Sequence, residues 1–563
     1  MERTNMHFWL CCCIALTLYS CGNDGRKNYN QVITQNEKVV VMEDKLVLPE
    51  EKLVLEDQSI EEEIVIEVPR TAAPPPTIEE VPEKEVLPQH IEIQPLPENQ
   101  FQTTLNQPLS TFSIDVDRAS YSIIRRYLNS GQLPPQYAVR LEECINYFKY
   151  DYPQPEGKVP LAVYNEMTNC PWEKDHKLLM VGMQGKNLPI DKVPPSNLVF
   201  LIDVSGSMSD YNKLDLLKKA FRLLVHQLRP DDRVAIVVYA GASGIVLEST
   251  PGHKKEKILG VLNHLEAGGS TAGAEGIELA YQIAEKHFLK KGNNRIILAT
   301  DGDFNVGPSS EDALIRLIEQ KRDNDIFLSV LGFGMGNYQD SKMEQLADHG
   351  NGNYAYIDNV LEAKKVLVNE FAGTLYTIAK DVKIQIEFNP AHVQSYRLLG
   401  YENRILNKED FNNDRIDAGE IGAGHNVTAL YEIVPQGMKK KQNDNVDPLK
   451  YQQKMLTQGS KKTEWMTIKL RYKEPKGKES KLLSYTGKDL GIPFVSASQN
   501  LRFSAAVSSF AMLLRESQYA GQSNFKDIIE WAKNAKGEDN NGERAEFIRL
   551  AETAQSLHLT KAK

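Results

Sequence analysis

The chain has 563 residues, of which 41% are hydrophobic and 25% charged, an ordinary composition that excludes a wholly disordered or fibrous protein. Its net charge of −10 is concentrated in one segment, because residues 21–100 carry 18 acidic and 7 basic side chains while residues 101–563 total +1. The folded part therefore has no basic excess that could neutralise phosphates, and nucleic acid is not expected as a partner.

The first 20 residues have the character of a signal peptide. An apolar run of 12 residues, 8–19, is too short to cross a bilayer of about 30 Å and matches a secretory h-region. The sequence Leu-Tyr-Ser-Cys that ends at Cys21 resembles the bacterial lipobox, in which the cysteine becomes the lipidated first residue of the mature chain. An ordinary signal peptide that happens to contain a cysteine is the alternative. We expect lipid attachment at Cys21 and a place in the cell envelope, on the periplasmic face or at the outer membrane or cell surface.

Residues 21–100 are expected to form an acidic, disordered stalk. After Cys21 they contain nine prolines and one aromatic residue, Tyr29. Such a segment cannot bury enough apolar area to offset its conformational entropy, and its like charges keep it extended.

An N-terminal flanking module is predicted over residues 101–190, with helices at 119–128 and 140–150 and strands at 161–166 and 177–183. Two cysteines of the mature chain, Cys144 and Cys170, could form a disulfide in an oxidising compartment. The alternative places Cys144 on the apolar face of a helix as a small buried residue, and the sequence leaves both open.

The central part, residues 191–372, alternates strands and helices. Strands are predicted at 197–203, 233–240, 294–300 and 326–332, and the clearest helix covers 213–228. Apolar strands separated by amphipathic helices indicate an α/β fold with a doubly wound, Rossmann-like parallel sheet covered on both faces. Residues 373–560 are predicted to form a C-terminal β-rich module with strands at 380–388, 428–434 and 465–472, followed by helices at 498–516 and 525–533.

Oxygen-bearing side chains gather where the central strands end. Asp203, Ser205 and Ser207 follow the first strand, Asp301 follows the third, and Thr271 lies in a glycine-rich loop between them. Ligands bind at the carboxyl edge of an open parallel sheet, so these five residues are expected to meet there. Carboxylates and hydroxyls favour a hard divalent cation, of which Mg²⁺ is the first expectation and Mn²⁺ and Ca²⁺ are alternatives.

These motifs resemble the metal-ion-dependent adhesion site of von Willebrand factor type A (VWA) domains, and all five positions match. The resemblance extends to bacterial YfbK-type lipoproteins, through residues 112–117, 143–153 and 416–432. It implies a non-enzymatic envelope protein in which an acidic side chain of a protein partner completes the metal's coordination.

Two further hypotheses about the function stay open. A metal-dependent hydrolase would need a general base beside the ion, for which Asp303 and Glu275 are the nearest candidates in the sequence. A purely architectural envelope protein would act through surfaces outside residues 197–370. For the motif itself, the alternatives are that the serines only cap a helix or turn, or that a bound metal only stiffens the loops.

Overall fold

The structure is a computed structural model, and it describes residues 97–189, 192–270, 273–302, 311–334, 338–370, 373, 375–416, 418–438 and 456–561. The chain separates into two compact units, Met1–Glu83 and Lys84–Lys563, and every described residue belongs to the second. The predicted signal peptide, Cys21 and almost all of the predicted stalk lie outside the described residues, as do Thr271 and Asp303.

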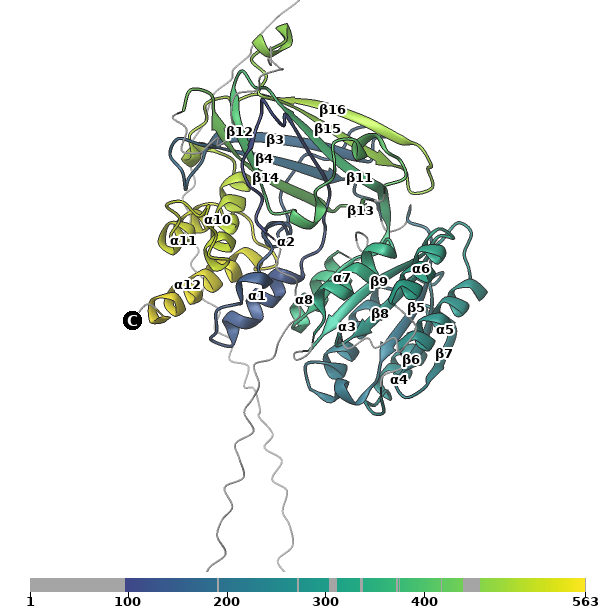
Figure 1. The fold of residues 1–563 in the computed structure, drawn as a ribbon. Coiled ribbons are helices and arrows are strands. Elements are labelled where there is room, and N and C mark those ends of the chain that lie inside the picture. Colours follow the sequence, from purple (N-terminus) through teal and green to yellow (C-terminus); the bar gives the residue numbers. More distant parts are fainter. Residues whose placement is uncertain are drawn as a thin grey trace, which may run out of the picture. The chain divides into compact units, whose positions relative to one another are not determined.

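A six-stranded sheet forms the central part (Figure 1), with strand order β10-β9-β8-β5-β6-β7. Its strands are β5 (Ser196–Asp203), β6 (Arg233–Tyr239), β7 (Ser243–Pro251), β8 (Asn293–Thr300), β9 (Ile326–Phe333) and β10 (Tyr354–Ile357). All neighbours pair in parallel except β7, which runs antiparallel to β6. The chain starts in the middle at β5, winds outward to β7 and returns to β8 on the other side of β5. This order is the doubly wound arrangement, and its switch point lies between β5 and β8.

Helices cover this sheet because each carries one apolar face. They are α3 (Leu214–Gln227), α4 (Lys255–Asn263), α5 (Gly273–Lys286), α6 (Glu311–Arg322), α7 (Asp340–His349) and α8 (Val360–Lys364). In α3 the predicted face of leucines with Phe221 is buried, and Phe221 stacks on Phe200 of β5 with ring centroids 4.3 Å apart. The four predicted strands and α3 are confirmed to within two residues at each end. The edge strands β7 and β10 were not predicted, since β7 is largely polar and β10 has only four residues.

Two antiparallel sheets contain strands from both ends of the described chain. One has the order β1-β12-β14-β4-β3, and the other β13-β11-β15-β16 with β2 also pairing with β11. Their N-terminal strands are β1 (Gln102–Thr103), β2 (Leu109–Ser113), β3 (Leu161–Asn169) and β4 (Lys177–Gly185). Their C-terminal strands are β11 (Thr377–Phe388), β12 (Val393–Leu399), β13 (Gly419–Gly422), β14 (Asn426–Pro435), β15 (Met466–Lys473) and β16 (Ser480–Gly487). Since β2 pairs with β11 and β4 with β14, the two segments that flank the central part share their sheets. The domain boundaries expected from the sequence stay a prediction.

The remaining helices pack together around a second core. They are α1 (Ala119–Asn129), α2 (Leu141–Asn146), α10 (Gln499–Leu514), α11 (Phe525–Asn534) and α12 (Glu543–Lys561). Their buried side chains, including Phe503 and Phe547, form one cluster with Phe148, which follows α2. Helix α2 is shorter than the predicted 140–150, because residues 147–150 leave the helix in a turn.

Cys144 and Cys170 are both buried and both free thiols. Cys144 lies in α2 beside the hydroxyl of Ser120, as expected for a small buried residue rather than half of a disulfide. Among the residues that the structure describes, no helix is long and apolar enough to cross a bilayer.

Candidate metal site at the sheet edge

The candidate site begins where β5 ends, at Asp203. This carboxylate is fully buried, and its Oδ1 accepts hydrogen bonds from the amide and the hydroxyl of Ser205, at 2.9 and 2.6 Å. Its Oδ2 accepts from Tyr239 Oη on β6 and from Thr300 Oγ1 on β8, both at 3.1 Å. The turn after β5 therefore holds Oδ1 of Asp203, and the two neighbouring strands hold its Oδ2.

The serine hydroxyls continue from Asp203 towards solvent. Ser205 Oγ lies 2.9 Å from Ser207 Oγ, and Ser205 is buried while Ser207 is exposed. Burial raises the pKa of Asp203, the hydrogen bonds from Ser205 oppose this rise, and the charge of Asp301 adds to it. Asp203, Ser205 and Ser207 thus form a row of oxygens from the buried strand end to the surface.

Asp301 reaches the same edge from the end of β8 and is 7% exposed. One side chain connects it to the serine turn, because Lys213 Nζ donates to Asp301 Oδ2 at 3.0 Å and to the carbonyl of Ser207 at 2.9 Å. The loop that leads to Thr271 is held against the same turn, since Gly206 N donates to Gly269 O at 3.0 Å and Gly268 N donates to Val204 O at 2.7 Å.

The structure therefore brings together four of the five predicted residues, Asp203, Ser205, Ser207 and Asp301. The fifth, Thr271, lies outside the described residues, and so does Asp303, one of the two bases considered for a hydrolase. The other, Glu275, is exposed in the first turn of α5. Two carboxylates and two hydroxyls at the switch point fit a hard divalent cation, since every donor is an oxygen.

Three residues of this site were not predicted: Lys213, Tyr239 and Thr300. A signal for Lys213 existed, because it directly precedes α3, and a cation at a helix N-terminus opposes the helix dipole. Such a residue needs a compensating anion, which Asp301 supplies. Tyr239 and Thr300 were covered only by the strand predictions, and nothing in their spacing indicated a contact with Asp203.

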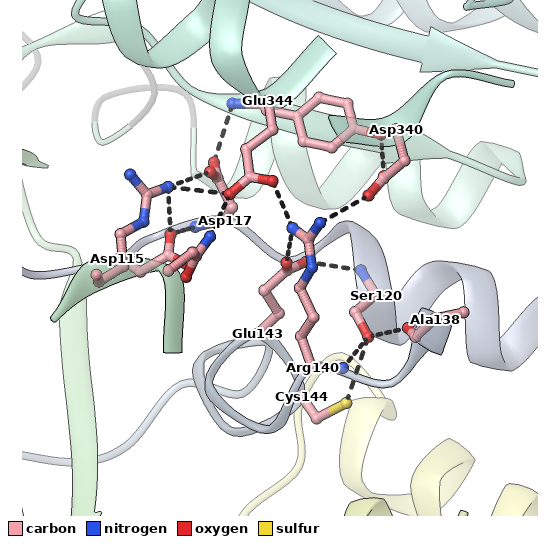
Figure 2. A network of polar contacts seen from close by, with 12 residues as sticks. Asp115, Asp117, Ser120, Ala138, Arg140, Glu143, Cys144, Asp340 and Glu344 are labelled. Carbon is pink, nitrogen blue, oxygen red and sulfur yellow. Dashed lines mark hydrogen bonds and ion pairs between the residues drawn. The ribbon is translucent and has the colours of Figure 1, made fainter. Parts of the chain in front are cut away.

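A second set of polar residues lies where residues 115–118 and α2 contact α7. Figure 2 shows Asp115, Asp117, Arg140 and Glu143 beside Asp340 and Glu344. Arg140 Nη1 donates to Glu143 Oε1 at 2.8 Å and also to Glu344 Oε2, so that it bridges α2 and α7 (Figure 2). Sequence reasoning treated residues 112–117 only as part of a family resemblance and assigned these carboxylates no contact.

Comparison with known proteins agrees with the class that this fold and site define, a VWA-domain protein. Residues 198–303 match the family model described as von Willebrand factor type A domain. Residues 89–180 match one described as von Willebrand factor, and residues 373–557 match one described as Uncharacterized protein YfbK, C-terminal.

Similarity to a full-length relative then gives the particular family. The chain is 45% identical over 468 residues to the Uncharacterized protein YfbK of Escherichia coli (strain K12), covering 82% of this chain and 80% of the relative. It is 23% identical over 269 residues to the inter-alpha-trypsin inhibitor heavy chain H3 of Pongo abelii, covering 44% of this chain and 30% of the relative. The solved von Willebrand factor type A structure from Catenulispora acidiphila is 14% identical with a TM-score of 0.37, over 68% of this chain and 89% of that one. The chain belongs to the YfbK family of VWA-domain proteins, and VWA domains form a general family of adhesion and protein-interaction domains.

Proposed function

We propose that the chain is a non-enzymatic binding protein of the cell envelope, which captures a protein partner through a divalent cation held by Asp203, Ser205, Ser207, Thr271 and Asp301. The observation that carries the proposal is the hydrogen-bonded row from Asp203 through Ser205 to the exposed Ser207, with Asp301 at the same edge. When bound, the cation would supply a coordination position for a carboxylate of the partner.

The protein's own residues have separate roles in this proposal. Asp203 and Asp301 supply charge from buried positions, where a cation is attracted more strongly than in water. The hydroxyls add ligands without adding negative charge, which leaves the ion able to attract an external carboxylate. Tyr239 and Thr300 hold Asp203 in one orientation, and Lys213 neutralises part of the charge of Asp301.

The anchor and the place in the cell are part of the same proposal. Lipid on Cys21 would hold the protein at the membrane, and residues 21–100 would act as an acidic stalk between the anchor and the VWA domain. Mg²⁺ is the proposed ion because it binds through few carboxylates and keeps positions for other ligands. Of the two bases considered for the hydrolase alternative, Glu275 is exposed on α5 and Asp303 lies outside the part of the chain that the structure describes.

Thermal unfolding at increasing Mg²⁺ concentration tests the site. An ion that binds only the folded state stabilises it by about 2.7 kcal/mol at a hundredfold excess over the Kd. Asp203→Ala is expected to abolish the Mg²⁺-dependent rise in Tm. The matched control is Asp210→Ala, because the side chain of Asp210 is 64% exposed and approaches the site only through its contact with Lys213, at 3.6 Å. The assignment is wrong if Asp203→Ala keeps the full shift, or if Asp210→Ala loses it as well.

A further inference from the structure

The contact between residues 115–118, α2 and α7 contains more negative than positive charge. We call its charged residues the junction cluster: the carboxylates of Asp115, Asp117, Glu142, Glu143, Asp340, Glu344 and Asp348, with the guanidinium groups of Arg140 and Arg404. All of these carboxylates except that of Asp348 are buried. Seven carboxylates face two cations, and buried charges are costly unless they are compensated.

The two arginines contact six of the seven carboxylates of the cluster. Arg140 contacts Glu143, Glu344 and Asp340. Arg404 contacts Asp348 at 2.7 Å, Asp117 and Glu344 at 3.3 Å, and Asp115 at 3.5 Å. Arg404 approaches Asp115 through Oδ1, the oxygen that also accepts the amide of Asp117.

Glu142 is the carboxylate of the cluster that contacts neither arginine. Glu142 is 0% exposed, and neither of its carboxylate oxygens makes a hydrogen bond of ordinary geometry with the described residues. Asp115 Oδ2 is likewise buried without a hydrogen bond. One oxygen from each of Asp115, Glu142 and Glu143 lies within 4.8 Å of the other two. An oxygen of Glu142 that makes no hydrogen bond thus lies in one compact group with an oxygen of Asp115 and one of Glu143. The oxygens of Glu143 already accept from Arg140 Nη1 and from the amide of Ser120.

The surroundings of Glu142 offer little compensation. The carboxylate of Glu402 lies near enough to act on Glu142, and it carries a charge of the same sign. Gly400 packs so closely that a Cβ there would lie 2.4 Å from Glu142 Oε2. Gly400 therefore lies directly against this carboxylate, and the buried charge of Glu142 lacks a compensating cation there.

We infer that Asp115, Glu142 and Glu143 form a second metal site, which takes Ca²⁺ and is distinct from the site at the sheet edge. Three carboxylates are hard oxygen ligands, and Ca²⁺ accepts irregular arrangements made entirely of protein oxygens more readily than Mg²⁺ does. The ligands come from the segment after β2 and from α2, not from β5 or β8. Because all three residues are buried, this ion joins parts of the fold and does not meet a partner.

Calorimetric titration of Ca²⁺ into the purified whole chain, after treatment with a chelator, tests this site. The background is Asp203→Ala, so that the sheet-edge site does not contribute and the two proposals can fail separately. We expect this variant to bind one Ca²⁺, and the added change Glu142→Gln to weaken binding more than about tenfold, because it removes one of three charged ligands. The matched control is Glu362→Gln, another buried carboxylate, which instead bonds to Arg125 and the hydroxyl of Tyr147.

A luminescence measurement covers the case in which Glu142→Gln does not fold. Tb³⁺ substitutes for Ca²⁺ and is excited through nearby tyrosines, and Tyr401 bonds to Asn146 of α2 beside the site. The Asp203→Ala variant is expected to sensitise Tb³⁺ emission that Ca²⁺ displaces. The inference is overturned if the Asp203→Ala variant binds no Ca²⁺ and sensitises no Tb³⁺. It is equally overturned if Glu142→Gln folds and binds Ca²⁺ as tightly as Glu362→Gln does.

Discussion

Replacing Arg404 by methionine is expected to be among the most destabilising single changes at the junction cluster. Its guanidinium group contacts Asp115, Asp117, Glu344 and Asp348, and the first three of these are buried. Removing one partner of a buried ion pair costs about 3–5 kcal/mol, while an exposed contact such as that with Asp348 contributes about 0–1 kcal/mol. Since three buried carboxylates lose the same cation, we expect the free energy of unfolding to fall by an amount near the upper end of that range, about 4–5 kcal/mol.

Urea unfolding at neutral pH measures this loss, with EDTA present so that no bound cation compensates for the missing charge. Arg415→Met is the matched control, because Arg415 lies on a nearby stretch of chain but is exposed. Its effect is expected to stay within about 0.5 kcal/mol. A loss below about 1 kcal/mol for Arg404→Met would refute the argument that the cluster depends on this cation.

Three other predictions follow from single positions. Burial and neighbouring cations lower the pKa of His425 to about 4. The unfolded chain therefore binds more protons than the folded one between pH 6.5 and 4. The free energy of unfolding falls by about 3 kcal/mol as the pH falls through this window. Urea unfolding across the window should show a shallower fall for His425→Phe. Lys213→Met removes a positive charge beside the sheet-edge site, so calorimetry should show Mg²⁺ binding that is about threefold to tenfold tighter. Unchanged or weaker binding would contradict this prediction. Gly352→Ala should lower the free energy of unfolding by more than about 2 kcal/mol, because the added Cβ would lie 1.8 Å from Leu328 O. The control Gly244→Ala should change stability little, since nothing lies within 4 Å of the Cβ added there. Similar Tm values for the two variants would contradict the close packing at Gly352.

Four strands of the central sheet, β5, β6, β8 and β9, could be predicted because the pattern that defines them is local. Each parallel strand is a short apolar run, and the helix between the first two has a single apolar face, so period and length alone were sufficient. The gathering of Asp203 and Asp301 also followed, because parallel strands of a doubly wound sheet end at the same edge. Lys213 was missed because its role depends on where a flexible side chain turns after the helix begins.

The flanking sheets and the junction cluster could not be predicted in the same way. Ser110 of β2 pairs with Ile386 of β11, and no local pattern indicates which distant strand will be the neighbour. The cluster depends on equally distant contacts, such as that between Arg140 and Glu344. The sequence predicted a helix at α2 but made it four residues too long at its end, and Glu142 had the pattern of an ordinary acidic residue in a first helical turn, where it is favoured by the helix dipole.

Partner capture tests the central claim most directly. The immobilised whole chain is exposed to envelope extract of its source cells in Mg²⁺ and in EDTA, beside Asp203→Ala and the control Asp210→Ala in Mg²⁺. We predict a protein that the unchanged chain and Asp210→Ala retain in Mg²⁺, and that is lost both in EDTA and with Asp203→Ala. Retention of the same proteins under all four conditions would contradict metal-dependent capture and would assign binding to other surfaces of the chain.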